Sequence, residues 1–491
     1  MSPNYSSPGV YIEEISKLAA SIQNVPTAIP AFIGHTEFAK NRDGDGLVNV
    51  PFIINSIREY EVNFGGPLPE TDVEIFIEEF EDGSHPQIII RSGSESLGSR
   101  FNMYYALQHF FENGGDTCYI VSVGDYHSDL KMAKDSLLNG LQSIEAIDEI
   151  TLILFSEAQG IGDHDSSDYY EIAQQALEQC ERLKDRFAII EVHKTAFDND
   201  LTAISDPINN DGIRDKLNYH LKWGAAYYPN LETTLKQIFD RSKILVTDHI
   251  LIKESGSKVS HPVSLVGKKL LDPETKDDLA NLRKGIYKTI EAQLNNIQII
   301  LPPGPAIAGI YSRVDSARGV WKAPANIAID ATIKPTVTID NQLNERLNID
   351  PSEGKSINAI RKFSGKGTVV WGARTLAGND NEWRYISVRR FFNMVEESVK
   401  KATGAFVFEP NDANTWVRVR SMIENFITIQ WRNGALAGAK PDHAFYVRVG
   451  IGETMTAQDI LEGRMIIEIG MAVVRPAEFI ILRITHKMLE S

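Results

Sequence analysis

Carboxylate, imidazole and amine side chains follow three stretches that the sequence predicts to be strands. They are Asp125 and His127, then Asp163, His164 and Asp165, and then His193 and Lys194. The carboxyl ends of parallel strands lie at one edge of a sheet, where α/β proteins bind their ligands. Oxygen and imidazole ligands together suit a divalent metal ion, so one hypothesis is a metal- or nucleotide-dependent enzyme. No spacing motif relates these residues, however, and loops are commonly polar. We therefore expect solvated loop residues without a catalytic role.

The sequence lacks the short motifs that specify common enzyme classes. It contains no GxxxxGK(S/T) phosphate loop, no GxGxxG after a strand, and no HExxH, GxSxG or CxxC motif. Asn41–Gly46 is similar to the start of a calcium-binding loop, but its twelfth position is Phe52, where a bidentate glutamate is required. Cys118 and Cys180 are too few for a disulfide framework or a thiolate zinc site, and both fall on apolar faces. We expect no cofactor, no metal and no enzymatic activity.

Charge is divided unevenly along the chain. The 491 residues carry a net charge of −16, with 50 Lys and Arg against 66 Asp and Glu. Residues 341–491 hold 20 basic and 17 acidic side chains, so they carry +3 and residues 1–340 carry −19. Phosphate contacts need clustered lysine and arginine. No apolar run approaches the ~20 residues of a membrane span, and the first residues show no signal-peptide pattern. We expect neither nucleic-acid binding nor direct membrane insertion.

Apolar strands alternate with helical patterns from about residue 100 to residue 230. Almost uninterrupted apolar runs occur at Cys118–Val123, Ile150–Phe155 and Phe187–Val192. Strands that are buried on both faces have such runs, and the helices between them favour a mainly parallel sheet. Residues 36–100 are acidic and turn-rich, and residues 253–276 are polar. We expect irregular or hairpin insertions in the first segment and a surface excursion in the second.

The region after about residue 345 has a different pattern. Helices are predicted around Val388–Val399 and Thr415–Trp431, and strands at Phe445–Val449 and Met465–Val474. The predicted fold is α/β, and α+β overall, with an outer α/β domain containing a mainly parallel sheet and a C-terminal α+β core domain. The expected parts are an N-terminal arm (1–26), an outer domain (27–344) with an insertion at about 36–100, an inner core domain (345–474) and a C-terminal strand or arm (475–491).

Short strands without a local partner lie at both ends of the chain. Val10, Tyr11 and Ile12 follow a turn signal at Ser6–Gly9, and no adjacent segment can form a hairpin with them. The last predicted strand, Phe479–Thr485, likewise lies close to a free end. A lone strand must pair with a distant segment or with another molecule.

Short motifs are distributed over nearly the whole chain. They are Pro8–Glu14, Val25–Thr27, Ala31–Gly34, Phe64–Pro67, Phe111–Gly115, Val320–Asn326, Asn358–Arg361, Trp371–Leu376, Arg384–Ile386, Val388–Arg390, Phe408–Asn411 and Pro476–Phe479. In this order they resemble the motifs of the contractile tail sheath family, which comprises phage tail sheaths and the sheaths of phage-tail-like injection systems. The moderate length and the lack of large C-terminal insertions look more like the injection systems. The motifs do not separate a phage sheath from the sheath of a released or membrane-anchored particle.

The resemblance implies a structural protein that polymerises and contracts. Subunits of this family stack as hexameric rings around an inner tube, and terminal strands of one subunit join the sheets of its neighbours. The interlocking strands implied here contain Val10, Tyr11, Ile12, Phe479, Ile480, Ile481 and Leu482, and they would complete the C-terminal core domain. The implied partners are identical or paralogous sheath subunits, the inner tube, the baseplate and terminal cap proteins. The implied location is the bacterial cytoplasm during assembly, within a particle that is then released or anchored at a membrane.

The uneven charge distribution also predicts which part of the subunit faces outward and which part faces the tube. The segment of charge −19 is expected on the outer surface, where like charge keeps large particles soluble, and the segment of charge +3 is expected beside the tube. The helix predicted at Thr415–Trp431 carries Arg418 and Arg432 opposite its apolar face, so these two are the tube-facing candidates. The alternative is that both arginines pair within their own subunit.

Overall fold

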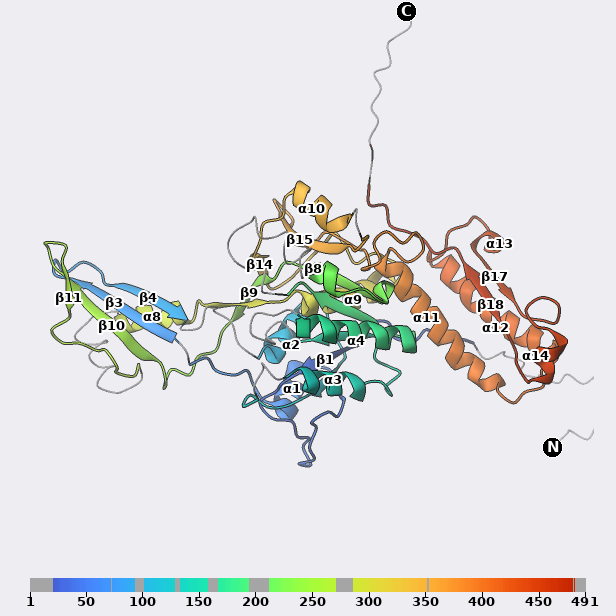
Figure 1. Cartoon of the computed structure of the whole chain (residues 1–491), viewed down its shortest axis with the longest axis horizontal. Coiled ribbons are helices and arrows are strands. Elements are labelled where there is room, and N and C mark those ends of the chain that lie inside the picture. The colour runs from blue at the N-terminus through green and yellow to red at the C-terminus, as the bar shows by residue number, and fades with distance from the viewer. Residues whose placement is uncertain are drawn as a thin grey trace, which may run out of the picture. The chain divides into compact units, whose positions relative to one another are not determined.

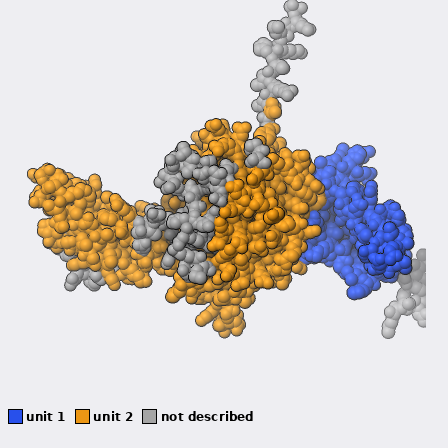
Figure 2. All heavy atoms as spheres, in the orientation of Figure 1, with its two compact units in different colours: residues 1–25, 394–474 blue, residues 26–393, 475–491 orange. Residues whose placement is uncertain are grey.

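The computed structural model describes residues 21–71, 73–92, 101–128, 133–157, 167–193, 212–270, 286–350, 353–479 and 481. The chain forms two compact units, which Figure 2 distinguishes by colour. Unit 1 contains residues 1–25 and 394–474, and unit 2 contains residues 26–393 and 475–491. The interlocking candidates Val10, Tyr11, Ile12, Ile480 and Leu482 lie outside the described residues.

A nine-stranded sheet forms the centre of unit 2 (Figure 1). Its order is β13 (Ile327–Ala328), β16 (Gly367–Val370), β15 (Ile357–Phe363), β8 (Gly224–Tyr228), β7 (Phe187–Glu191), β6 (Leu152–Phe155), β1 (Pro30–Gly34), β5 (Cys118–Ser122) and β2 (Phe52–Ile54). The strands from β15 to β5 are all parallel, and antiparallel strands lie at both ends of the sheet. The prediction of a mainly parallel sheet is therefore confirmed, with the three apolar runs forming β5, β6 and β7.

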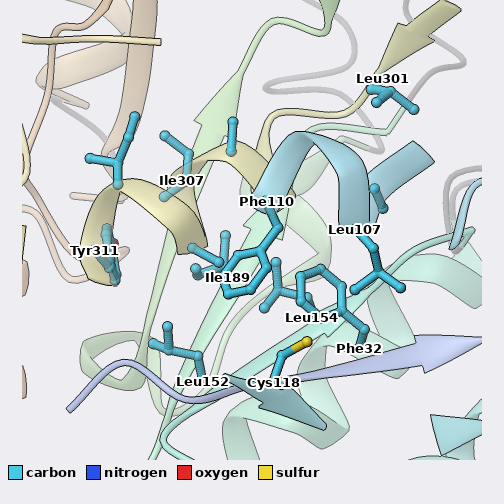
Figure 3. Packing of buried hydrophobic residues seen from close by; sticks show 14 of the residues in the cluster. Phe32, Leu107, Phe110, Cys118, Leu152, Leu154, Ile189, Leu301, Ile307 and Tyr311 are labelled. Carbon is cyan, nitrogen blue, oxygen red and sulfur yellow. The ribbon is translucent and has the colours of Figure 1, made fainter. Parts of the chain in front are cut away.

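Helices cover both faces of this sheet. One face packs against α3 (Lys134–Ser143), α4 (Ser167–Leu183) and α10 (Asn341–Asn348), and the other against α1 (Ile57–Phe64), α2 (Met103–Glu112) and α9 (Gly304–Arg318). The short α6 (Ile213–Lys216) and η5 (Leu221–Trp223) precede β8. Within β1, Ala31 and Ile33 enter the first core and Phe32 enters the second. Figure 3 shows the second core, where the rings of Phe32 and Phe110 lie 5.3 Å apart. Because both faces are covered, consecutive strand residues are apolar.

Two smaller sheets also belong to unit 2. A three-stranded sheet contains β12 (Gln298–Leu301), β9 (Leu231–Lys236) and β14 (Thr332–Pro335). A four-stranded sheet has the order β11 (Lys258–Ser260), β10 (Leu245–Ile252), β3 (Val73–Phe80) and β4 (Gln87–Ser92), and α8 (Ile286–Leu294) shares its core. β3 and β4 form an antiparallel hairpin, and β3 also pairs in parallel with β10. Two segments that the sequence predicts as separate surface insertions therefore contribute to one sheet.

Unit 1 is a small α+β unit. It contains the C-terminal part of α11 (Ile386–Thr403), then η7 (Gly404–Phe406), α12 (Ala413–Arg432), α13 (Pro441–Ala444), β17 (Phe445–Arg448), α14 (Ala457–Leu461) and β18 (Glu468–Met471). α12 begins after Asp412, whose side chain accepts a hydrogen bond from the backbone N–H of Thr415, as an N-cap does. Its buried stripe includes Val419, Ile423 and Phe426. Both predicted helices and the predicted strand at Phe445 are confirmed.

The compact units divide within α11, between residues 393 and 394, whereas the sequence pattern predicts a boundary near residue 345. The difference arises because β15 and β16 follow residue 345 and yet extend the nine-stranded sheet next to β8. The segment from Arg475 onward is also grouped with unit 2. Its described residues Phe479 and Ile481 lie in no strand, and they are 67% and 77% exposed.

Candidate functional site

The carboxyl edge of the nine-stranded sheet has a topological switch point at β1, which lies between β5 and β6. Open α/β sheets bind ligands at such points, because the loops of the two neighbouring strands diverge there. In this chain His35 follows β1, Glu157 follows β6, and the two residues bind each other. Both carboxylate oxygens of Glu157 accept from the His35 backbone N–H, at 2.9 and 2.8 Å, and the imidazole Nδ1 lies 2.8 Å from Oε2. Neither side chain is more than 1% exposed.

A second buried carboxylate at this edge binds the N-terminus of a helix. α9 begins at Gly304, and the free N–H groups of a helix N-terminus attract anions. Oε1 of Glu191, the last residue of β7, accepts from the backbone N–H of Gly304 at 2.9 Å. A carboxylate of the chain therefore binds a backbone N–H at the N-terminus of α9.

Burial changes the pKa of one carboxyl group at the switch point. It raises the pKa of the Glu157 carboxyl, although the hydrogen bonds from His35 act in the opposite direction. Around this pair, the rings of His35 and Phe101 are 5.4 Å apart and those of Phe101 and Tyr126 are 4.9 Å apart. The buried pair therefore lies beside aromatic side chains at the ends of β1 and β6.

The residues proposed as an enzyme site are in different environments. Asp125 and His127 are exposed, and Oδ1 of Asp125 accepts from the His127 backbone N–H at 2.9 Å in a local turn. His193 is only 4% exposed, so the expectation that it is solvated is wrong. It is covered because α4 places Tyr169 over its ring, with centroids 5.5 Å apart, and the hydroxyl of Tyr170 accepts from its backbone N–H at 3.0 Å. Asp163, His164, Asp165 and Lys194 lie outside the described residues.

Replacing Asp125, His127 and His164 together by alanine should leave assembly and contraction unchanged, because the first two are exposed and hold no buried contact. Adding His193→Ala should lower the stability by about 1–3 kcal/mol through the lost packing against Tyr169. Thermal unfolding of both variants, with particle microscopy, checks this expectation. Loss of contraction in the triple variant at an unchanged melting temperature would restore the enzyme hypothesis.

The start of the C-terminal segment is fixed to unit 2 by a bidentate ion pair. Arg374 donates from Nε to Oε1 of Glu478 at 2.9 Å and from Nη2 to Oε2 at 2.5 Å. Their side chains are 5% and 17% exposed. The remaining guanidinium nitrogen donates to the carbonyl oxygens of Asn348 and Gly378, both at 3.3 Å. Burial alone would lower the pKa of Arg374, but the hydrogen bonds and the charge attraction of Glu478 together outweigh it, and the pKa is raised. We call this contact the C-terminal clamp.

The segment that follows the N-terminal arm is fixed at two successive points. Within unit 1, the backbone N–H of Val25 donates to Oγ of Ser398 at 3.1 Å, and the amide of Gln430 donates to Asn24 Oδ1 at 2.8 Å. Within unit 2, the next contacts involve Thr27, whose carbonyl accepts from Arg390 at 2.8 Å. Arg390 is in turn paired with the buried carboxylate of Asp315, at 2.5 Å. We call the residues at which each terminal segment joins its folded unit the root of that segment. Hydrogen bonds therefore fix the roots of both terminal segments.

The described sheet of unit 1 has two strands, and β17 packs against α12 while β18 is partly exposed. In the described part of the chain, β17 and β18 pair only with each other in this sheet. No residue of β18 is buried, and Ile469 and Met471 are half-exposed. On β17, Tyr446 is 44% exposed. The helix supports this sheet, but exposed strand edges pair readily with further strands.

The two tube-facing candidates are exposed on α12. Nη1 of Arg418 lies 3.7 Å from Oε2 of Glu409, and its guanidinium lies 5.3 Å from the ring centre of Phe406. For Arg418 the structure therefore contains an intramolecular pair, as the alternative hypothesis expected, but with side chains that are 62% and 46% exposed. Such a pair is worth about 0–1 kcal/mol and can be exchanged for another partner. Arg432 is exposed in the last turn of the helix.

Sequence comparisons relate this chain to tail sheath proteins. Residues 378–487 match the family described as the phage tail sheath C-terminal domain. The tail sheath protein of Vibrio phage KVP40 is 28% identical over 144 residues, and that of Enterobacteria phage T4 is 26% identical over 157 residues. The alignments cover 29% and 31% of this chain but only 21% and 23% of the phage proteins.

Solved structures match over almost the whole length. In the contracted PVC sheath complex of an extracellular contractile injection system, a chain is 28% identical with a TM-score of 0.61, and 99% of each chain is covered. A chain of the anti-feeding prophage baseplate structure is 30% identical with a TM-score of 0.62, covering 99% of this chain and 100% of its own length. The chain therefore belongs to the contractile tail sheath family. It is a structural sheath subunit, of the kind found in contractile tails and injection systems.

Proposed function

We propose that this subunit polymerises as stacked hexameric rings around an inner tube and contracts to drive that tube through a target membrane. The observation that supports the proposal most is the combination of fixed terminal segments and a sheet of two strands that can accept further strands. The roots of both terminal segments are fixed by hydrogen bonds, while β17 and β18 form a sheet of only two strands in the described part of unit 1.

Strand donation between subunits connects these two features. In this proposal the N-terminal strand around Tyr11 and a C-terminal strand from Phe479 onward join the β17–β18 sheet of neighbouring subunits. The two donated strands lie beside each other there. Main-chain hydrogen bonds then supply affinity, and side chains on alternate residues set the register. Such contacts are head-to-tail, so they build an extended assembly rather than a closed dimer.

Contraction would then be a rearrangement of rigid bodies. Subunits rotate as units while the donated strands remain paired, so that neighbouring rings stay connected. The extended sheath is metastable in this proposal, and new contacts between subunits supply the energy. The carboxyl edge of the large sheet supports mechanics over catalysis, because Glu157 and Glu191 are buried there and bind backbone N–H groups of the chain.

The partners and location of the subunit follow from the same proposal. It contacts copies or paralogues of itself, the inner tube, the baseplate and terminal cap proteins. Assembly takes place in the bacterial cytoplasm, and the particle is then released or held at a membrane. Among the helices that the structure describes, none has the length and apolarity to span a membrane.

Negative-stain microscopy of the expressed operon tests the proposal. We expect striated tubes in two lengths, with the short form wider and displaced along an exposed inner tube. A monodisperse soluble protein, in the presence of the tube protein and baseplate, would contradict it.

Charge reversal on α12 tests the orientation of unit 1 toward the tube. Arg418→Glu with Arg432→Glu should reduce the assembly of sheath around tube, and the defect should grow at low salt because like charges then repel over a longer distance. Arg58→Glu, which reverses an exposed arginine on α1 of unit 2, is the matched control and should assemble normally. Normal co-assembly of the double variant would show that these arginines do not face the tube.

A further inference from the structure

The four-stranded sheet of unit 2 has its own small apolar core. This core combines Ile75 and Ile77 of β3, Val246 of β10, and Ile286 and Ile290 of α8. Small cores are commonly reinforced by disulfides or by a metal ion, because they bury little apolar surface. A disulfide is not available here, since the two cysteines of the chain are buried in the cores of the nine-stranded sheet.

The strand register brings two histidines and a carboxylate onto one face of this sheet. β10 and β11 are antiparallel with Ile250 opposite Ser260, and the next pair in the ladder is His249 opposite His261, with the His261 backbone N–H donating to the His249 carbonyl at 3.1 Å. On the other side of β10, His249 is opposite Ile77 of β3. Glu79 is two residues further along β3, so its side chain projects from the same face.

The side chains of these three residues converge at the end of the apolar core. Nε2 of His249 lies 2.8 Å from Oε1 of Glu79, and Nε2 of His261 lies 3.8 Å from Oε2. The two imidazole rings are stacked, with centroids 4.3 Å apart and an angle of 5° between their planes. One candidate ligand atom from each residue lies within 4.8 Å of those from the other two. The His249 side chain is fully buried, while those of His261 and Glu79 are 15% and 21% exposed, so solvent reaches one side of the group.

We propose that Glu79, His249 and His261 bind a divalent transition-metal ion, with Zn²⁺ as the representative. Two neutral imidazoles and one carboxylate form a common ligand set for zinc, and a water molecule on the solvent side would complete a tetrahedral site. The ion would join β3 to both strands of the β10–β11 hairpin. It would thus reinforce a sheet whose two halves are separated by more than 150 residues of sequence.

Binding requires a defined rearrangement of the rings. Nδ1 of His249 accepts from the Leu265 backbone N–H at 3.3 Å, which places the ring hydrogen of neutral His249 on Nε2, facing Glu79. A metal ion would take the place of this hydrogen, which would then move to Nδ1 at the expense of the contact with Leu265. For His261, Nδ1 accepts from the Val263 backbone N–H at 3.1 Å, so the ring hydrogen of the neutral form lies on Nε2. On metal binding this hydrogen would move to Nδ1, which lies 3.0 Å from the Val263 carbonyl oxygen and can donate there, and Nε2 would become the ligand atom. Both rings must also turn out of their parallel stack, because a ligand nitrogen binds its metal in the plane of the ring.

Zinc binding to the tag-free, full-length subunit tests the proposal. Isothermal titration with Zn²⁺ should show one site per chain, and the bound ion should raise the melting temperature in a manner that EDTA reverses. His261→Asn and Glu79→Gln, which change the two less buried ligands, should each weaken binding at least tenfold. His127→Asn removes an exposed histidine of the nine-stranded sheet's loops and should bind zinc as the unchanged chain does.

Two further measurements distinguish a specific transition-metal site from nonspecific binding of cations at the surface. Because ligand nitrogens must be unprotonated, affinity should fall from about pH 7.5 to about pH 5.5. Mg²⁺, which prefers an octahedral set of oxygens, should not compete. Stoichiometric binding that survives both ligand substitutions, or no saturable binding at zinc concentrations up to about 1 mM, would overturn the proposal. Circular dichroism of each variant shows whether it is folded before its affinity is compared.

Discussion

Deleting residues 1–16 should leave a folded, soluble subunit that can no longer form a contractile sheath. The deletion removes the strand around Tyr11 but retains the root of the arm. In the root, Ile22 is buried, the Val25 backbone N–H binds Ser398, and Asn24 binds Gln430. Unit 1 should therefore keep its melting temperature to within a few degrees. The N-terminal donated strand is lost from every subunit at once, so the effect on assembly should be nearly complete.

Sedimentation and microscopy of particles measure assembly, and circular dichroism of the free subunit measures whether it is folded. Deletion of residues 1–7, which keeps the Val10–Ile12 strand, is the matched control and should assemble. Val10→Glu with Ile12→Glu changes side chains on one face of the strand, and it should impair assembly more than Tyr11→Glu if Val10 and Ile12 face the neighbouring core. Contractile sheaths of normal appearance from the 1–16 deletion would refute strand donation by the N-terminal arm.

Glu478→Gln should release the root of the C-terminal segment and reduce the yield of intact sheath. The substitution keeps the size of the side chain but leaves the guanidinium of Arg374, whose side chain is 5% exposed, without its carboxylate. Hydrogen bonds to charged groups contribute about 1.5–3 kcal/mol. A loss of about 1.4 kcal/mol is tenfold in an equilibrium constant, so the equilibrium constant for clamping should fall by about tenfold or more. The effect multiplies over a sheath, because each ring depends on all of its donated strands.

The soluble subunit should remain folded in this variant, because the apolar cores of unit 2 do not include the clamp. Its melting temperature and the length distribution of its sheaths are the two measurements. Glu382→Gln removes an exposed carboxylate near the same loop and serves as the control. If Glu478→Gln sheaths match the control in yield and in contraction, the clamp does not position the C-terminal strand.

The parts of the fold that depend on local patterns could be predicted from the sequence. Strands β5, β6 and β7 are continuous apolar runs because helices cover both of their faces. Helices α11 and α12 have apolar stripes at helical spacing, and they occur where those stripes predict them. The family resemblance added an expectation that no local pattern contains, namely that the predicted terminal strands pair with other subunits.

The parts that depend on pairing between distant segments could not be predicted. β15 and β8 are separated by well over a hundred residues, and an apolar run does not indicate its neighbour in a sheet. For the same reason, the sequence could not indicate that Glu79 lies beside His249 and His261, since only the parallel pairing of β3 with β10 brings them together. The burial of His193 was missed because loop residues are polar on average, whereas two tyrosines of α4 cover this one. No sequence signal was available for any of these three contacts.

Helical reconstruction by cryo-electron microscopy of the particle assembled from the native operon is the most direct test of the proposed mechanism. The prediction is that the β17–β18 sheet of every subunit is extended by two further strands. One should contain Val10–Ile12 from one neighbour and the other should begin near Phe479 from a second neighbour, in both the extended and the contracted form. A reconstruction in which both terminal segments fold back onto their own subunit, or in which the sheet keeps two strands, would contradict the proposed strand exchange.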